Sequence, residues 1–394
     1  MRRKKRIYGQ KKCIYSLFYR VNYDTDMKNS KKIIFLLIPL VFFVLLLESG
    51  LRFFGDFAPT RVLCYDPILG RSYCANTKGY LRDNNISMYV EVNADGLLGK
   101  PYSIKRIPGI KRVAVLGDSF TSGEAVTPDK KFTGQWESKL AKIFGDDVEV
   151  INFGVGGTGT WQQLQRFHVK AKKYSPDLTV LIFLWGNDID NNIDQFKSGS
   201  RNPLLDDYQI GLKENILTKR KNFNKWLWNN SALYQFTHDR YKHVEIFFKG
   251  FFRPAHMKRP ELPNNQSKSI KKPVDSISIY DDIYHFNSEG WELTKKLILK
   301  LQEEVSSNGS LFAVIQIAGL SRKQVDYSIL PTKEFNEFLA THGIDSFDVF
   351  EYFGNMDASN PNFIPNDGHF SETGHRNFSK ITLEFLVKSL DNLE

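Results

Sequence analysis

From Arg112 onward, short apolar runs alternate with amphipathic segments, and this alternation constrains the fold more than any other feature of the chain. The apolar runs predict five strands, at residues 113–116, 148–153, 178–184, 311–317 and just before Asp348. The amphipathic segments predict helices at 132–144, 161–173, 288–306, 333–342 and 372–390. Strands that alternate with helices form a mostly parallel sheet covered on both faces, so the chain is predicted to adopt an α/β fold.

A second constraint comes from the longest apolar run, residues 33–47. With the residues through 54 it is about 22 residues long, close to the roughly 20 that a helix needs to span a bilayer. The alternative is a cleaved signal peptide, but Glu-Ser-Gly-Leu-Arg follows Leu47 and offers no small-x-small cleavage site. We therefore predict an uncleaved transmembrane anchor at 33–54.

The residues before the anchor are strongly basic. Residues 1–32 hold eleven Lys and Arg against two Asp, a net charge of +9, and positive flanks of a membrane helix stay in the cytoplasm. We predict a cytoplasmic leader at 1–32, with the rest of the chain on the exported (periplasmic or extracellular) side. A nucleic-acid-binding tail is the alternative for the leader. Translation could start at Met1 or at Met27.

Beyond the anchor, three parts are predicted. Residues 55–110 form a membrane-proximal extension with one alternating strand at 88–92, and 111–390 form the α/β domain. An insertion at about 190–285 interrupts that domain. Its stretch 219–260 carries a net charge of +8 among ten aromatic residues, which suits contact with a membrane surface or an anionic polymer. Alternatively, the aromatic residues pack a helical cap onto the domain.

Cys64 and Cys74 lie ten residues apart in the part of the chain that is predicted to be exported, and they are a candidate disulfide.

The first strand ends in the turn Gly117-Asp-Ser-Phe-Thr-Ser-Gly123. Ser119 is thereby placed at the carboxyl end of a strand and near a helix start, where open α/β sheets bind ligands and backbone N–H groups favour negative charge. Ser119 is either a helix-capping residue or a nucleophile. The second reading requires a base and an oxyanion hole elsewhere in the chain.

Three later segments could supply them. The second strand is followed by a glycine block at 152–159, the third ends in Asn187-Asp188, and Asp367-Gly-His369 precedes the last helix. Serine ester hydrolysis needs a nucleophile, an imidazole base, a group that orients it and donors for the oxyanion. We assign Ser119 as nucleophile, His369 as base and Asp367 as the orienting acid. The oxyanion donors would be the N–H groups of Ser119 and Gly157 and the side-chain amide of Asn187.

These four blocks, in this order over roughly residues 110–390, resemble the SGNH/GDSL hydrolase superfamily. The resemblance implies a three-layer flavodoxin-like sandwich and acyl-ester chemistry without a metal or nucleotide cofactor. The anchor and the segment Asp66-Pro-Ile-Leu-Gly70 resemble membrane-tethered bacterial members.

Two positions depart from the family pattern. The family commonly has Asp three residues before the histidine, where this chain has Asn366, so the site could work as a Ser-His dyad. The family's Gly-x-Asn-Asp also becomes Gly186-Asn187-Asp188 here.

Other residues have competing roles. Gly154, Gly156 and Gly159 match a dinucleotide-binding fingerprint, but no acidic residue ends the next strand as a ribose would require. His375 is an alternative base, but it falls inside the predicted last helix, where surface packing is expected. Asp118 and Asp188 are expected to brace their turns.

The sequence leaves three functions open. The first is an esterase acting on a lipid, small-molecule or glycan ester through an acyl-serine intermediate. The second is an acyltransferase that passes the same acyl group to a cell-envelope polysaccharide. The third is a non-catalytic glycan-binding or scaffold module. Neither the acyl group, the acceptor nor the oligomeric state follows from the sequence.

Overall fold

The computed structural model describes residues 29–53, 62–66, 68–83, 86–145, 148–185, 187–197, 227, 231–234, 236–237, 283–317, 329–353, 360–364 and 367–391. The chain divides into two units, residues 1–59 with 231–237 and residues 60–230 with 238–394. Most of the predicted insertion, including nearly all of its basic and aromatic stretch, lies outside the described residues. Its expected contact with a membrane surface or an anionic polymer is therefore still a prediction.

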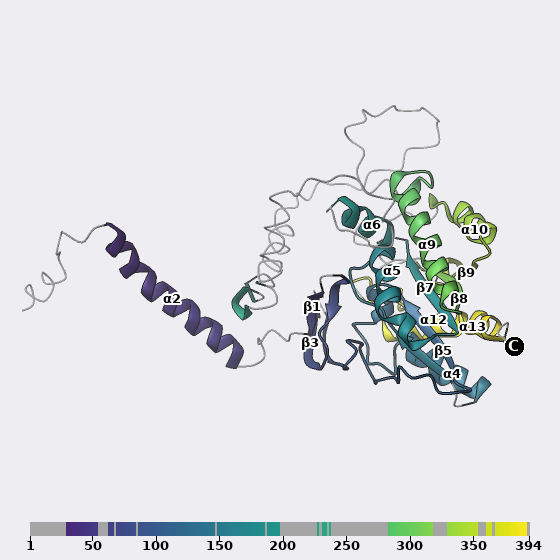
Figure 1. Cartoon of the computed structure of the whole chain (residues 1–394), viewed down its shortest axis with the longest axis horizontal. Coiled ribbons are helices and arrows are strands. Elements are labelled where there is room, and N and C mark those ends of the chain that lie inside the picture. Colours follow the sequence, from purple (N-terminus) through teal and green to yellow (C-terminus); the bar gives the residue numbers. More distant parts are fainter. Residues whose placement is uncertain are drawn as a thin grey trace, which may run out of the picture. The chain divides into compact units, whose positions relative to one another are not determined.

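The larger unit is built on a five-stranded parallel sheet (Figure 1). Its strands are β5 (Lys111–Leu116), β6 (Val148–Asn152), β7 (Leu178–Leu184), β8 (Leu311–Ile317) and β9 (Asp345–Asp348), in the spatial order β6-β5-β7-β8-β9. All four neighbouring pairs are parallel. This order is that of the flavodoxin-like doubly wound sheet. The predicted α/β fold is thus confirmed.

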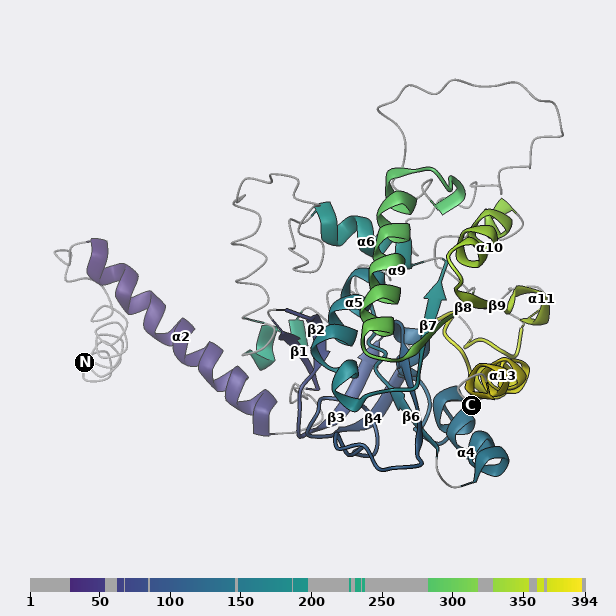
Figure 2. The same cartoon turned by 45° about the vertical axis from the view of Figure 1, so that its right-hand side comes forward.

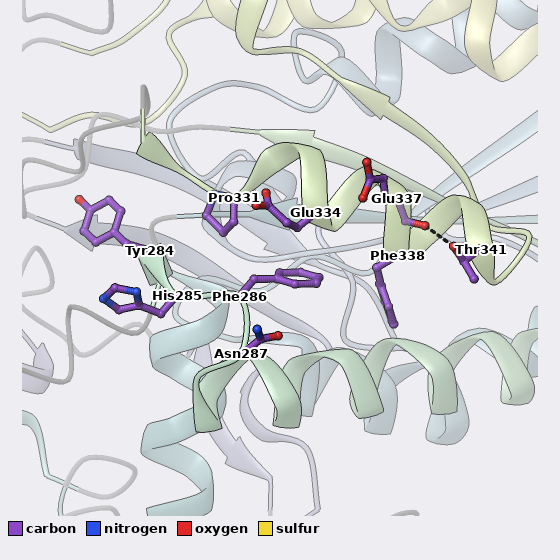
Figure 3. Close-up of a pocket in the computed structure, with 9 residues that line it drawn as sticks. All are labelled: Tyr284, His285, Phe286, Asn287, Pro331, Glu334, Glu337, Phe338 and Thr341. Atoms are coloured by element: carbon purple, nitrogen blue, oxygen red, sulfur yellow. Dashed lines mark hydrogen bonds between the residues drawn. The ribbon is translucent and has the colours of Figure 1, made fainter.

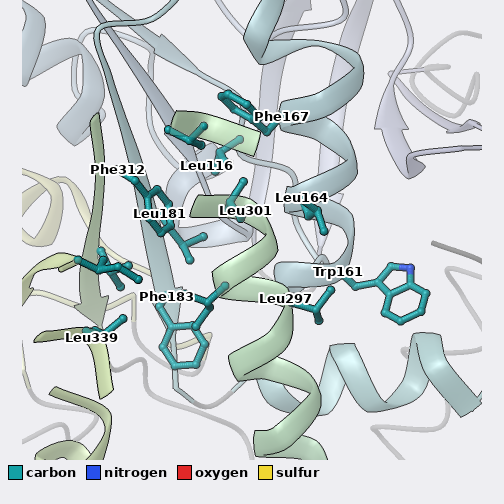
Figure 4. Packing of buried hydrophobic residues seen from close by; sticks show 14 of the residues in the cluster. Leu116, Trp161, Leu164, Phe167, Leu181, Phe183, Leu297, Leu301, Phe312 and Leu339 are labelled. Carbon is teal, nitrogen blue, oxygen red and sulfur yellow. The ribbon is translucent and has the colours of Figure 1, made fainter. Parts of the chain in front are cut away.

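Helices cover both faces of this sheet because successive side chains of a strand point to opposite sides. Ala114 and Leu116 pack under α5 (Thr160–Val169), α9 (Glu289–Ser307) and α10 (Thr332–Thr341), as Figure 4 shows in part. Val113 and Val115 pack under α4 (Phe132–Phe144), α12 (Glu372–Ile381) and α13 (Leu383–Asp391) on the other face. Figure 2 shows α4 and α13 on this side of the sheet. Every residue of β7 is buried, as expected for a central strand covered on both sides.

Among the described residues, four further helical elements complete the core domain. They are the one-turn helix α3 (Ser119–Ser122), η1 (Ala171–Tyr174), α6 (Asp188–Lys197) and α11 (Phe350–Phe353). The predicted last helix is wrong in one respect, because the structure breaks it into α12 and α13 at Thr382. There the Thr382 hydroxyl donates to the Phe378 carbonyl at 2.6 Å and accepts from the indole N–H of Trp136 at 3.0 Å. A threonine that bonds back to the preceding turn disturbs a helix at that point.

Residues 55–110, predicted as a membrane-proximal extension, contain two hairpins where the sequence predicts one strand. β1 (Leu63–Asp66) pairs with β2 (Gly70–Tyr73), and β3 (Thr77–Asp83) pairs with β4 (Ile86–Val92). Asp66 sets the first turn, since its side chain accepts from the N–H groups of Ile68 and Leu69. A disulfide joins Cys64 of β1 to Cys74, directly after β2, with the Cα atoms 5.3 Å apart.

In the smaller unit, the segment predicted as the anchor lies in α2 (Asn29–Phe53), whose side chains are described from Leu37 onward. Near the end of α2, Glu48 pairs with Arg52 and accepts from the N–H groups of Ala232 and Leu233. Among the residues that the structure describes, no helix is both long enough and apolar enough to cross a membrane. The predicted anchor is therefore not confirmed.

Candidate active site

Ser119 lies where β5 ends, on the one-turn helix α3. The turn is compact because Gly117 has no side chain: a Cβ there would lie 2.0 Å from the Thr121 hydroxyl oxygen. Asp118 caps α3 and accepts from the Phe120 N–H at 3.0 Å. Asp118 therefore caps the helix, and the hydroxyl of Ser119 is not used for capping.

The segment before α12 brings His369 to this serine. The Nε2 atom of His369 lies 2.7 Å from the Ser119 Oγ, across 250 residues of sequence. On the other side of the ring, Nδ1 is hydrogen-bonded to Asp367, whose side chain is fully buried. Asp367 also accepts from the His369 N–H at 3.2 Å. The three residues thus form the chain of contacts that a serine nucleophile, its base and an orienting acid require.

The electrostatics of the site favour a basic imidazole. Burial by itself disfavours the imidazolium, but the hydrogen bond and charge of Asp367, with smaller contributions from Asp118 and Glu124, raise the pKa of His369 above its ordinary value. Phe120 packs against the ring with the centroids 5.2 Å apart. The ring is therefore fixed in position and has increased affinity for the proton it would take from Ser119.

The candidate oxyanion donors lie around the same serine. A Cβ on Gly156 would lie 3.3 Å from the Ser119 Cβ, and the neighbouring Gly157 has a φ of 70°, a conformation that favours glycine. The amide nitrogen of Asn187 donates to Asp118 at 2.9 Å, which leaves its second hydrogen for another acceptor. Asp118 thus holds both the nucleophile helix and the donor amide.

The other carboxylate singled out by sequence, Asp188, has the bracing role expected of it. It is buried, and its side chain accepts from the Leu184 N–H at 3.2 Å at the end of β7. Burial, together with the charge of Asp118, raises its pKa well above the ordinary value. Burial also raises the pKa of Asp118, against the hydrogen bonds that it accepts from Asn187 and Phe120.

The glycines of the dinucleotide-like fingerprint serve close packing. A Cβ on Gly154 would lie 2.5 Å from the Ser122 backbone nitrogen, and one on Gly159 would lie 2.7 Å from the Asn192 side-chain oxygen. Glycine at these two positions lets the loop after β6 lie directly against α3 and α6. Close packing of this loop therefore explains the glycine spacing, and a nucleotide site is not needed to explain it.

His375 is not at the surface, contrary to the sequence-based expectation. It is buried on α12, accepts from the Phe132 N–H through Nδ1 at 3.3 Å and stacks on the Phe132 ring. Burial, with the nearby charges of Lys131 and His369, lowers its pKa to about 3. It is a neutral structural acceptor and does not contact Ser119.

We therefore expect His375→Ala to lower the free energy of unfolding by about 1–3 kcal/mol, because the buried Phe132 N–H loses its acceptor. The pH midpoint of esterase activity should not move. Thermal unfolding and a pH profile measure the two effects, with the exposed His342→Ala as the control for loss of an imidazole. A shifted pH midpoint would contradict this role.

The structure also places three residues near the site that sequence reasoning missed. Tyr73 of β2 is buried and donates to the Glu124 carboxylate at 2.7 Å. That carboxylate lies 2.7 Å from where a Gly156 Cβ would be, and the Arg71 guanidinium lies 3.2 Å from where a Gly157 Cβ would be. Nothing in the sequence indicated that the hairpin β1–β2 contacts the glycine block.

A separate pocket of about 550 Å³ lies between the segment before α9 and α10 (Figure 3). Aromatic side chains, among them Phe286 and Phe338, line it together with the carboxylates Glu334 and Glu337. None of its lining residues belongs to the Ser119 site. The pocket therefore has no part in the catalytic arrangement described above.

The chain is similar to known proteins in sequence and in structure. Residues 115–290 match the GDSL-like Lipase/Acylhydrolase family, a range that includes Ser119, Gly157 and Asn187. The chain is also similar in structure to a lipase/acylhydrolase from Enterococcus faecalis (15% identity, 70% of this chain and 95% of that one, TM-score 0.35). The esterase EstA from Pseudoalteromonas sp. is similar at 9% identity (71% and 99% covered, TM-score 0.38). A two-domain esterase active on acetylated mannans is similar at 11% identity (71% and 50% covered, TM-score 0.35). No curated protein matched the sequence.

Proposed function

Given that this chain belongs to the GDSL-like lipase/acylhydrolase family and hydrolyses ester bonds, we propose that it does so through a covalent acyl-Ser119 intermediate. The observation that carries the proposal is the unbroken contact from Ser119 through His369 to the buried Asp367. The third hypothesis from the sequence, a non-catalytic module, does not agree with the family assignment.

The reaction follows from the positions of these groups. As the Ser119 Oγ attacks the ester carbonyl carbon, the His369 Nε2 takes the hydroxyl proton, and Asp367 stabilises the imidazolium. The tetrahedral oxyanion accepts hydrogen bonds from the Ser119 and Gly157 N–H groups and the Asn187 amide. When the intermediate collapses, His369 gives the proton to the departing alcohol. A water molecule, deprotonated by His369, then releases the acid and restores Ser119.

Labelling with a fluorophosphonate tests the nucleophile. The reagent phosphonylates an activated serine, so the full chain in detergent should be labelled on the peptide that contains Ser119, as mass spectrometry would show. An adduct on another serine, or no adduct on the folded protein, would contradict the proposal.

The acyl acceptor is tested separately. Acyl release to water is expected with 4-nitrophenyl esters of different chain length. Adding a polysaccharide acceptor distinguishes the esterase from the acyltransferase, because a transferase would form a new sugar ester in place of free acid. Product analysis by mass spectrometry with and without the acceptor separates the two.

We further propose that α2 anchors the protein in a membrane with the catalytic domain on the exported side. In support, the apolar side chains of α2 from Leu37 to Leu46 are exposed in its own unit, and the preceding residues carry the +9 charge. The Cys64–Cys74 disulfide suits an oxidising compartment.

Membrane extraction provides the test. We expect the full chain to stay with the membrane pellet in alkaline carbonate, and a variant that lacks residues 1–59 to be released. Thiol labelling in intact cells should find Cys64 and Cys74 oxidised. Release of the full chain by carbonate, or free thiols at both positions, would contradict the anchor or the orientation respectively.

A further inference from the structure

We propose that Arg71 binds an anionic group of the substrate beside the oxyanion hole, so that the enzyme selects esters of molecules that carry a carboxylate, sulfate or phosphate. The inference rests on the proposed acyl-Ser119 reaction and names its substrate class. It makes the membrane-proximal hairpin part of the substrate site.

Arg71 is at the right place for this role. Its Nη1 atom lies 3.2 Å from where a Cβ on Gly157 would be, so the guanidinium lies directly over the glycine that is the candidate oxyanion donor. Both Arg71 and Gly157 are exposed. A substrate carbonyl that reaches the Gly157 N–H would therefore bring its neighbouring atoms within range of the guanidinium.

The strand that carries Arg71 is held in place by contacts with two parts of the site. The Arg71 carbonyl accepts from Arg166, which is buried on α5, at 2.9 Å. Two residues further on, the buried Tyr73 donates to Glu124, directly after the nucleophile helix. The Cys64–Cys74 disulfide closes the hairpin behind them. The backbone at Arg71 is thus held between the Ser119 segment and the helix that follows the glycine block.

The charge of Arg71 is available for a ligand. Within the described part of the chain, its guanidinium has neither a hydrogen bond nor an ion pair, whereas the exposed Arg106 pairs with Asp177. A guanidinium presents a planar set of donors that matches carboxylate, sulfate and phosphate oxygens. An exposed, unpaired guanidinium over an oxyanion donor is suited to bind an anion on the substrate.

Glu124 determines on which side of Ser119 the anion can lie. Its carboxylate would be 2.7 Å from a Gly156 Cβ, and that same Cβ would be 3.3 Å from the Ser119 Cβ. Like charges repel, so an anionic group is disfavoured beside Gly156 and Glu124 and favoured beside Gly157 and Arg71. The two side chains together orient an anionic ester in one direction across the nucleophile.

Matched pairs of esters test the proposal with the full chain in detergent. For an anion on the alcohol side, O-acetylated glucuronate is compared with O-acetylated glucose. For an anion on the acyl side, 4-nitrophenyl hemisuccinate is compared with 4-nitrophenyl butyrate. In one of the two pairs, Arg71→Ala should lower the ratio of kcat/KM for the anionic over the neutral ester by about 10- to 100-fold, the value of a charged hydrogen bond. The pair that responds identifies the side of the ester on which the anion lies.

Two further variants make the result specific. Arg71→Lys keeps the charge but not the planar fork, so it should recover part of the lost ratio. Lys78→Ala removes a cation from the same extension, at an exposed ion pair with Glu91, and should leave the ratio unchanged.

Two outcomes would overturn the proposal. An unchanged ratio in both pairs would show that Arg71 does not bind the substrate anion. An equal loss of kcat/KM for anionic and neutral esters would show a structural or oxyanion role. Failure of the acyl-serine reaction is distinguishable from both, because the parent protein would then neither react with a fluorophosphonate nor hydrolyse either ester of a pair.

Discussion

Replacing Ser119 with alanine is expected to lower kcat for ester hydrolysis by about 10⁶-fold and to abolish labelling by a fluorophosphonate. The Oγ is the atom that forms the acyl bond, and no other group within the described residues contacts His369 Nε2 in its place. The residual rate would come from binding and from the oxyanion donors, which the substitution leaves intact.

The same substitution should have little effect on folding, because the cap of α3 comes from Asp118 and not from Ser119. The melting temperature of Ser119→Ala should therefore lie close to that of the parent protein. Ser138→Ala, at an exposed serine of α4, is the matched control and should keep both activity and labelling. Labelling that persists in Ser119→Ala would mean that another residue is the nucleophile.

The second large effect is expected for Asp367→Asn, which should lower kcat by about 10³- to 10⁴-fold. Asp367 is the only described partner of the His369 Nδ1. The asparagine amide can hold the His369 ring in the wrong tautomer. Because the amide is uncharged, it also no longer stabilises the His369 imidazolium. Since Asn366 occupies the position at which the family commonly has its aspartate, this variant also decides between a triad and a Ser-His dyad.

The pH profile gives an independent measure of the same contact. His369 must be neutral to accept the proton of Ser119, so activity rises with pH as the imidazolium loses its proton. Asp367 raises the pKa of His369, which places the parent midpoint above the ordinary histidine value. Without that carboxylate the effect of burial remains, and the midpoint should move to lower pH.

Asp129→Asn, an exposed aspartate outside the site, serves as the control for loss of a carboxylate and should change neither kcat nor the midpoint. Full activity of Asp367→Asn would show that the dyad suffices. A large loss of kcat with no movement of the midpoint would show that Asp367 acts by some means other than its charge on His369.

Much of the fold could be read from the sequence because its signals are local. The central strands β7 and β8 are largely apolar runs, and the bounds of α4 agree with the amphipathic pattern. The break at Thr382 could not be read, since it depends on the Trp136 indole donated from another helix. The hairpin β1–β2 was missed because four-residue strands carry little periodicity of their own.

The candidate site divides in the same way. The blocks around Ser119, Asn187 and His369 could be found from the sequence, because each follows a predicted strand or precedes a predicted helix. The role of Asp367 was an assignment by proximity to His369, and the structure adds its burial and its bond to Nδ1. Arg71 and Glu124 carry no local signal, because their neighbours come from the glycine block, 32–86 residues away along the chain.

By itself, therefore, the sequence determined the order of the strands and helices and the four segments that end at one edge of the sheet. Hydrophobic periodicity and turn-forming residues depend only on positions a few residues apart, so they can be recognised in the sequence. The tertiary structure alone decided that Asp118 caps the nucleophile helix and holds Asn187, that His375 is a buried acceptor, and that Arg71 lies over Gly157. These contacts join residues that are brought together only when the helices and the hairpin pack on the sheet.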